Sequence, residues 1–223
     1  MMPKECFPGT ACNPNLAPDT GAKGKNMMAM VSDETTVDRE PAVVRRTPGL
    51  LLGPYYPLTP SNGSDADLWS GDARLPDGAR YLQLQGRVLN LLGVPVADAL
   101  VEIWHADYHG RYRHPSAPDH ERVVKGFAGH GSVCSDTQGR FAFRSLVPGA
   151  YADGLVQRAP HVHVQVTGQV DRLITQIFLP GHPLNGHDRW YRAVARPELL
   201  TPDVLRDGAD TLALAWTVVL TQG

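Results

Sequence analysis

The chain has 223 residues, enough for one large domain or two small ones. Its 21 lysines and arginines are balanced by 23 aspartates and glutamates, so no basic excess exists to bind nucleic acid. Pro, Gly and polar residues interrupt every uncharged stretch well short of the roughly 18 apolar residues that a membrane-spanning helix needs. The 22 glycines and 19 prolines exceed average usage and are disfavoured inside long helices. A helical bundle is therefore excluded, and short strands joined by turns are favoured.

Two regions differ in composition. Residues 1–46 are polar, with scattered Gly, Pro, Asn and Thr, and we predict a flexible N-terminal arm there, with one domain at 47–223. The N-terminus lacks a basic stretch followed by an apolar one, so we expect no secretory signal and a cytoplasmic location. Cys6, Cys12 and Cys134 are too few for a disulfide framework, and we expect Cys134 to be a small buried side chain.

Alternating apolar and polar side chains predict strands within the domain. Residues 81–91 and 99–106 alternate in this way, and residues 133–147 contain two extended runs around a turn at 136–139, which predicts a β-hairpin. Further strands are expected at 161–167, 172–179 and 211–221, and short helices near 186–194 and 202–207. These elements predict an all-β fold: an antiparallel β-sandwich core with long loops and a few short helices.

The sharpest local feature is the pair His161 and His163. Residues two apart in a strand project from the same face, so both imidazoles would point one way while Val162 and Val164 enter the core. Two convergent imidazoles are a natural pair of metal ligands. The alternative is the solvated face of an amphipathic strand, because Gln165 shares that face.

The remaining ligands of such a site are not obvious from nearby residues. No acidic residue follows the histidines closely enough for a site of two histidines and one carboxylate, and Cys134 stands alone as a thiolate. Tyrosine is the ligand type that remains. Tyr112 and Tyr151 are the candidates, and each could equally be an ordinary half-buried tyrosine.

Several motifs occur together in a fixed order along the chain. They are GPYYP at 53–57, GRYRHP at 110–115, SDTQGRFAFRSLVPGAY at 135–151, RAPHVHV at 158–164 and LITQIF at 173–178. In this order they resemble the intradiol ring-cleavage dioxygenases, and within that family the protocatechuate branch. The resemblance covers roughly three-quarters of the chain.

The resemblance implies a reaction as well as a fold. It implies that a catecholic substrate, of the catechol, protocatechuate or hydroxyquinol type, is cleaved with O2 to a cis,cis-muconate-type diacid by a homo-oligomer. Arg158 would stabilise negative charge on the substrate, and Gln176 would line the same pocket. Tyr151 would act both in catalysis and as a ligand. The implied cofactor is a non-haem iron(III), Fe(3+), held by Tyr112, Tyr151, His161 and His163.

Some residues depart from the family pattern or have alternative roles. The segment 152–157, between the second tyrosine and the arginine, is shorter than is usual, which predicts a more open site. Tyr56 in the GPYYP motif is a candidate for substrate binding, with core packing as its alternative. Arg111 and Arg113 would either attract an acidic substrate group or be paired on the surface.

Two rival interpretations come from the same residues. The stretches GRVLNLLGVPVADALVEI and SDTQGRFAFRSLVPGAY also resemble Cna-B-like and carboxypeptidase-regulatory-like domains, which are non-catalytic binding modules. Those modules are shorter and do not require two tyrosines together with His-x-His. A structural subunit without the ligand set is the third possibility, and all four ligands are present here.

Overall fold

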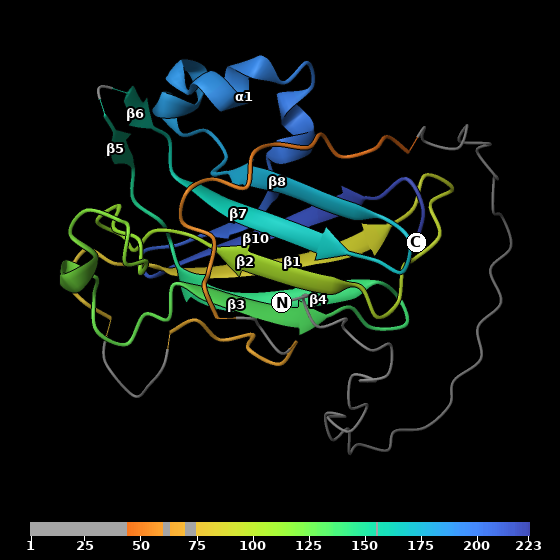
Figure 1. The fold of residues 1–223 in the computed structure, drawn as a ribbon, viewed down its shortest axis with the longest axis horizontal. Coiled ribbons are helices and arrows are strands. Elements are labelled where there is room, and N and C mark those ends of the chain that lie inside the picture. The colour runs from red at the N-terminus through yellow and green to blue at the C-terminus, as the bar shows by residue number, and fades with distance from the viewer. Residues whose placement is uncertain (1–43, 60–62, 70–74, 155) are drawn as a thin grey trace, which may run out of the picture. The chain divides into compact units, whose positions relative to one another are not determined.

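The computed structural model describes residues 44–59, 63–69, 75–154 and 156–223, so most of the arm predicted at 1–46 lies outside the described residues. Val44–Gly223 form one unit built on two four-stranded sheets (Figure 1). The first sheet contains, in spatial order, β4 (Arg140–Leu146), β1 (Tyr81–Leu89), β10 (Thr211–Val219) and β9 (Asp203–Asp207). The second contains β3 (His130–Cys134), β2 (Leu100–Trp104), β7 (His161–Thr167) and β8 (Arg172–Phe178).

The remaining elements are short. A separate two-stranded hairpin consists of β5 (Tyr151–Asp153) and β6 (Val156–Arg158). The helices are η1 (His120–Arg122), η2 (Pro183–His187), α1 (Arg189–Ala193) and η3 (Pro197–Leu200). The hairpin and α1 lie near the end of the second sheet at which β7 begins (Figure 1). The all-β sandwich that the sequence predicts is therefore confirmed.

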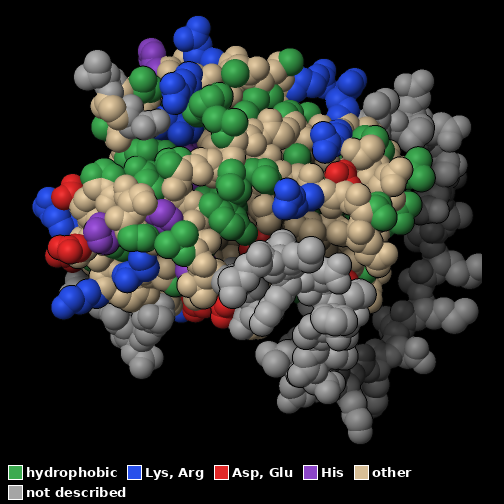
Figure 2. All heavy atoms as spheres, in the orientation of Figure 1, with side chains coloured by type: hydrophobic (Ala, Val, Ile, Leu, Met, Phe, Trp, Pro, Cys, Tyr) green, Lys and Arg blue, Asp and Glu red, His purple; other side chains and the backbone are tan. Residues whose placement is uncertain are grey.

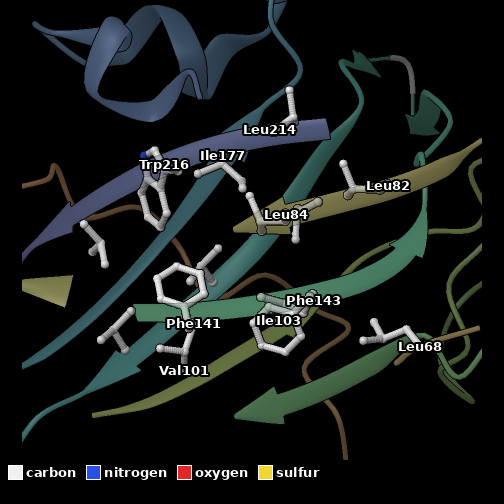
Figure 3. Close-up of a cluster of buried hydrophobic side chains, with 14 of the residues drawn as sticks. Leu68, Leu82, Leu84, Val101, Ile103, Phe141, Phe143, Ile177, Leu214 and Trp216 are labelled. Carbon is white, nitrogen blue, oxygen red and sulfur yellow. The ribbon is translucent and has the colours of Figure 1, made fainter. Parts of the chain in front are cut away.

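The core lies between the two sheets. Leu82 and Leu84 of β1 and Val101 and Ile103 of β2 project into it and are at most 1% exposed (Figure 3). The polar residues between them face the other way, as alternation predicts. Burying one such side chain contributes about 1.5–3 kcal/mol, so the apolar alternation fixes which face of each strand is covered.

One strand pair departs from the antiparallel pattern. β1 and β10 run parallel along their full length, with Tyr81 opposite Thr211 and Leu89 opposite Val219. Parallel neighbours cannot be joined by a tight turn. The connection between β1 and β10 is long, because most of the domain lies between the two strands in the sequence.

The predicted hairpin at 133–147 is wrong in its pairing. The turn is present, since the Asp136 side chain accepts hydrogen bonds from the backbone N–H groups of Gln138 and Arg140, both at 2.8 Å. However, β3 pairs with β2 and β4 pairs with β1, so the turn crosses from one sheet to the other. Turn residues fix a local reversal of the chain, whereas the partner of each strand is decided by packing.

Two further expectations are corrected. The helix expected at 202–207 is instead the strand β9, which is exposed and pairs with β10 as the edge of its sheet. Backbone pairing to β10 outweighs the weak local helix signal there. Cys134 is half-buried and disulfide-bonded, so it is not the lone thiol that the sequence predicts. The short helices near 186–194 are confirmed as η2 and α1.

The described part of the chain contains only short helices. No helix among the described residues is long and apolar enough to cross a membrane. On the face that Figure 2 shows, lysine and arginine side chains form separate groups between hydrophobic and other side chains.

Candidate metal centre

Strand β7 places two imidazoles side by side on its outer face. Val162 and Val164 enter the core, so His161 and His163 project together from the opposite face, with their Nε2 atoms 3.3 Å apart. Both histidines are 2% exposed. The His161 Nδ1–H donates to the carbonyl oxygen of Ala159 at 2.6 Å, which makes Nε2 the unprotonated nitrogen, the one that can bind a cation.

Both imidazoles are held in the neutral form that binds metals. Burial, and then the nearby Arg158 cation, lowers the pKa of His161 to about 3. Burial, followed by His161 and Arg158, holds the pKa of His163 well below its ordinary value. Trp104 stacks on the His163 ring with centroids 4.9 Å apart and planes inclined by 11°, which fixes the orientation of that ring.

Tyr112 reaches the histidines from a tightly folded loop. Its hydroxyl donates to His161 Nε2 at 3.4 Å, and its side chain is 4% exposed. The loop is organised by the buried Asp107, whose Oδ1 accepts from the backbone N–H groups of His109 and Arg111 at 2.9 and 3.0 Å. Burial, and then the adjacent Tyr151, raises the pKa of Tyr112, so the phenol stays protonated unless a cation is bound.

The two tyrosine-bearing segments are pressed together by glycines. Gly110 has φ of +81°, and a Cβ there would collide with the carbonyl oxygen of Ala150. Gly149 packs as closely, since a Cβ there would lie 2.8 Å from the Gly110 nitrogen. This contact brings the rings of Tyr112 and Tyr151 into an edge-to-face arrangement with centroids 5.3 Å apart.

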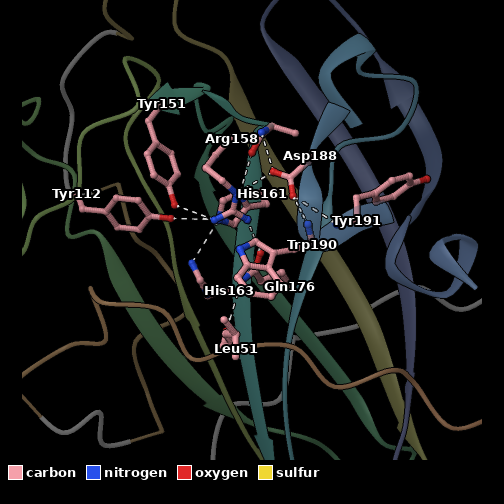
Figure 4. A network of polar contacts seen from close by, with 11 residues as sticks. Leu51, Tyr112, Tyr151, Arg158, His161, His163, Gln176, Asp188, Trp190 and Tyr191 are labelled. Carbon is pink, nitrogen blue, oxygen red and sulfur yellow. Dashed lines mark hydrogen bonds and ion pairs between the residues drawn. The ribbon is translucent and has the colours of Figure 1, made fainter. Parts of the chain in front are cut away.

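The short β5–β6 hairpin brings Tyr151 opposite Arg158. The two residues are cross-strand partners, and Arg158 Nη1 donates to the Tyr151 hydroxyl at 3.2 Å (Figure 4). The segment 152–157 that is short for the family is therefore this hairpin. The neighbouring cavity is lined in part by Ala150 and Ala152, small side chains that leave space beside the Tyr151 ring.

Arg158 is a buried cation whose guanidinium nitrogens all have partners. The side chain is 4% exposed, its Nε donates to Asp188 Oδ2 at 2.8 Å, and its Nη2 donates to Gln176 Oε1 at 2.9 Å. Gln176 Nε2 in turn donates to the Leu51 carbonyl oxygen at 3.3 Å, which fixes the orientation of the amide. Figure 4 shows these side chains converging beside the histidines.

A cavity of about 400 Å³ opens beside the two tyrosines. Its lining includes Tyr112, Tyr151, Tyr55 and Arg111. Tyr55 packs on Tyr112 with ring centroids 4.7 Å apart and forms one wall. Arg113, by contrast, does not line this cavity, and its Nε donates to the Phe127 backbone carbonyl oxygen at 2.7 Å.

Tyr56 points away from this cavity. Its hydroxyl donates to Glu102 Oε1 at 3.2 Å, and its ring packs edge-on against Trp104. Tyr56 therefore contacts the site through Trp104, whereas its neighbour Tyr55 lines the cavity. The alternation of side chains along an extended segment explains why two adjacent tyrosines point to different environments.

The structure brings six of the seven predicted site residues into one cluster. They are Tyr112, Tyr151, Arg158, His161, His163 and Gln176. Sequence analysis missed Tyr55, Trp104, Gly53 and Asp188. The sequence could have pointed to Asp188, because an aspartate directly before a short helix is a typical N-cap. No sequence pattern could have pointed to Gly53, because its role depends on its close approach to His163, which is far away in the sequence.

The donors at this centre suit a trivalent cation. Two phenols are hard donors that become anionic when bound, and two neutral imidazoles complete the set. The two imidazole nitrogens that face each other at 3.3 Å could both bind one cation. Among the described residues no group of three or more His, Cys, Asp or Glu could hold a metal. The tyrosine hydroxyls beside the histidines are the further donors that this cluster offers.

Comparison with known proteins identifies the family of the chain. The family model described as "Dioxygenase" matches residues 51–222. The protocatechuate 3,4-dioxygenase beta chain of Burkholderia cepacia is 35% identical over 137 residues, which is 59% of this chain and 55% of that protein. Catechol 1,2-dioxygenase 1 of Acinetobacter lwoffii is 31% identical, over 79% of this chain and 60% of that protein. The chain spans about half to three-fifths of the length of these relatives.

A solved structure shares the same architecture. The dioxygenase domain of a dioxygenase and carbohydrate-binding protein fusion from Streptomyces sp. SirexAA-E superposes with a TM-score of 0.62 and 25% identity. The match covers 80% of this chain and 100% of that one. The chain belongs to the intradiol ring-cleavage dioxygenase family.

Proposed function

We propose that this chain is a non-haem iron(III) intradiol dioxygenase that cleaves a catecholic ring with O2 to a cis,cis-muconate-type diacid. The observation that carries the proposal is the convergence of two tyrosines and two neutral histidines beside a buried arginine. Relatives named for catechol, protocatechuate and hydroxyquinol support a substrate of one of these types.

Four side chains of this centre would hold the iron. They are Tyr112, Tyr151, His161 and His163. When bound there, iron(III) would draw electron density from a coordinated catecholate and make its ring reactive toward O2. Two phenolates and a hydroxide balance the three positive charges, so the buried site holds no uncompensated charge.

Tyr151 is the ligand suited to exchange with the substrate. Both tyrosines line the cavity, but Tyr151 is half-buried whereas Tyr112 is almost fully buried. A neutral catechol that binds as the dianion gives up two protons, which the Tyr151 phenolate and a hydroxide would take up as a phenol and a water, so the charge would remain balanced. Arg158 Nη1 already donates to the Tyr151 hydroxyl, and it can keep donating to that oxygen after Tyr151 is released as a phenol.

Arg158 and Gln176 would supply the polar donors of the reaction, and they lie beside Tyr151 rather than in the lining of the cavity. Arg158 is a fixed cation in a water-poor environment, which is where a charged donor stabilises developing negative charge most strongly. Gln176 holds the guanidinium from one side and is itself held by the Leu51 carbonyl oxygen. We assign the aromatic wall of the cavity to Tyr55, which packs on Tyr112. Tyr56 does not bind substrate in this proposal and packs against Trp104 instead.

The wider setting of the enzyme is part of the same proposal. The proposal assigns catalysis to a domain at residues 47–223, and a homo-oligomer is expected from the family resemblance. The partners are the catecholic substrate and O2. The cytoplasmic location remains a prediction from the N-terminal sequence.

Iron content and colour test the metal assignment. Purified after expression with adequate iron, the chain should be red-brown through phenolate-to-iron(III) charge transfer and should contain close to one iron per chain. Tyr112→Phe should abolish or strongly shift the absorption band. An unchanged band in Tyr112→Phe would show that Tyr112 is not a ligand.

Oxygen consumption tests the reaction. Catechol, protocatechuate and hydroxyquinol should be offered separately, with O2 uptake and diacid formation measured for each. At least one should give equal molar amounts of O2 consumed and diacid formed. A colourless, iron-free protein without O2 uptake would contradict the proposal and favour a non-catalytic β-sandwich module.

A further inference from the structure

Asp188 is a fully buried carboxylate that contacts Arg158 directly. It is 0% exposed and lies at the start of α1, 30 residues beyond Arg158 in the sequence. Its Oδ2 accepts from Arg158 Nε at 2.8 Å and from the backbone N–H of Ala159 at 3.0 Å. Among the described residues it is the acidic side chain that forms an ion pair with Arg158.

The other oxygen of the same carboxylate holds a different element. Asp188 Oδ1 accepts from the backbone N–H groups of Trp190 and Tyr191, at 2.9 and 3.3 Å, and so caps α1. One carboxylate thus connects the first turn of α1 to the guanidinium that faces Tyr151 (Figure 4). The Arg158 hydrogen bonds are one factor that holds the pKa of Asp188 below its usual value, although its burial acts in the opposite direction.

The contacts of Arg158 leave it little freedom to rotate. Its Nε is taken by Asp188, its Nη2 by Gln176, and its Nη1 is directed at the Tyr151 hydroxyl. A planar guanidinium has its five donors in a fixed geometry, so fixing two nitrogens fixes the third. Without the carboxylate, a buried cation would lose its counter-charge and the partner that sets the plane of the group.

From these contacts we propose that Asp188 is a positioning residue of the reaction: it holds Arg158 so that Nη1 faces the site occupied by the Tyr151 hydroxyl. The inference rests on the proposed dioxygenase function. Asp188 does not line the cavity and acts through Arg158. Its second role, capping α1, ties the position of Arg158 to the segment that follows β8.

Asp188→Asn separates these two roles. Asparagine caps helices about as well as aspartate, so its side-chain oxygen retains the bonds to Trp190 and Tyr191. The amide NH2 then faces the Nε–H of Arg158 and the N–H of Ala159, and a donor cannot accept from either. The guanidinium should rotate away from Tyr151 while α1 keeps its cap.

The kinetic experiment compares four forms of the full chain loaded with iron. They are the wild type, Asp188→Asn, Arg158→Ala and the double variant. Asp188→Asn should lower kcat for O2 uptake about 100-fold, as expected when a reacting group is misplaced by about 1 Å. Its dissociation constant for catechol without O2 and its iron content should change less than about threefold. In the Arg158→Ala background, Asp188→Asn should lower kcat no further.

A matched control excludes a general effect of losing an aspartate. Asp136 also accepts two backbone N–H groups with one carboxylate oxygen, but it lies in the exposed turn before β4. Asp136→Asn should leave kcat unchanged. Additive losses in the double variant, or an unchanged kcat in Asp188→Asn, would overturn the proposal.

A measurement without catalysis separates this inference from the proposed function. In the metal-free full chain, the Arg158 Nε–H should give a shifted, slowly exchanging NMR signal, assigned by its absence from Arg158→Ala. Asp188→Asn should return that signal to the position and exchange rate of a solvated arginine. A signal unmoved by Asp188→Asn would contradict the positioning of Arg158 by Asp188, even if the enzyme is active. Absence of O2 uptake by the wild type, with the signal moving as expected, would instead refute the proposed function.

Discussion

Tyr151 and Arg158 face each other across a two-stranded hairpin, with Arg158 Nη1 donating to the Tyr151 hydroxyl at 3.2 Å. The shortness of the β5–β6 connection produces this relationship, because it puts the two residues in the same cross-strand pair. A candidate metal ligand and a buried cation are thereby held in contact before any substrate arrives. The stability of the region should depend on this pairing.

Replacing Arg158 should destabilise the fold. Arg158→Ala leaves the carboxylate of Asp188 buried without its counter-charge and leaves Gln176 Oε1 without its donor. Loss of one partner of a buried ion pair costs about 3–5 kcal/mol of unfolding free energy. Urea denaturation of the metal-free protein measures this loss. Arg144→Ala removes a surface pair with Asp67 and should cost less than about 1 kcal/mol; equal losses in both variants would contradict the buried role of Arg158.

Gly53 should be required for the geometry of His163. A Cβ at Gly53 would lie 2.8 Å from His163 Cε1, and the residue has φ of +80°. Gly53→Ala should therefore push the imidazole away from His161 and lower iron content per chain severalfold. Gly78 has nearly the same φ, +81°, and a Cβ there would meet no atom within 4 Å, so Gly78→Ala has the backbone strain alone. Similar iron content in both variants would show that the contact with His163 does not matter.

The metal-free protein should lose stability on mild acidification. Burial lowers the pKa of His105 to about 4 from 6.5 in the unfolded chain, so the unfolded state binds a proton first as the pH falls. The contribution of His105 to the free energy of unfolding is complete above pH 6.5. It is lost as the pH falls toward 4, by about 1.4 kcal/mol for each pH unit between the two pKa values. Unfolding free energies measured from pH 7 to 4 test this slope.

The matching variant is His105→Asn. The imidazole donates to the Ala106 carbonyl oxygen at 2.7 Å and accepts from Ser145 at 2.8 Å, and an amide can do both without titrating. His105→Asn should lower stability at pH 7 but make its decline between pH 6.5 and 4 less steep, while the decline due to the buried His161 and His163 remains. A decline as steep as that of the wild type would assign the effect to other groups.

Removing the metal should lower the thermal stability. A cation that binds only the folded chain stabilises it by about 2.7 kcal/mol when present at one hundred times its dissociation constant. Chelation should therefore lower Tm in the wild type, and restored iron(III) should recover it. Tyr112→Phe should show a smaller difference between its iron-loaded and chelated forms. An identical Tm with and without iron would count against a bound metal at this centre.

Local sequence pattern was sufficient for most of the strands and for one half of the site. The period of two in residues 161–167 already places His161 and His163 on one face and Val162 and Val164 in the core. Turn-forming residues at 136–139 also predict the reversal that is present. The same turn could not reveal that β3 and β4 belong to different sheets, because strand partners depend on contacts far along the chain.

The choice between Tyr55 and Tyr56 shows the limit of a motif. Both stand in GPYYP, and a shift of one residue exchanges the two environments. Only the path of this segment over β2 directs Tyr56 to Glu102 and leaves Tyr55 against Tyr112. Asp188 is a similar case, since its N-cap signal is local but its contact with Arg158 is not.

The sequence by itself determined an all-β chain with a pair of neighbouring imidazoles and two candidate tyrosines, because alternation and residue chemistry are local properties. Only the tertiary structure decided which side chains meet. Tyr112 and His161 are 49 residues apart in the chain, yet their side chains lie within 3.4 Å. Such contacts arise from close packing of separate segments, as where Gly110 meets Ala150, and local periodicity contains no information about them.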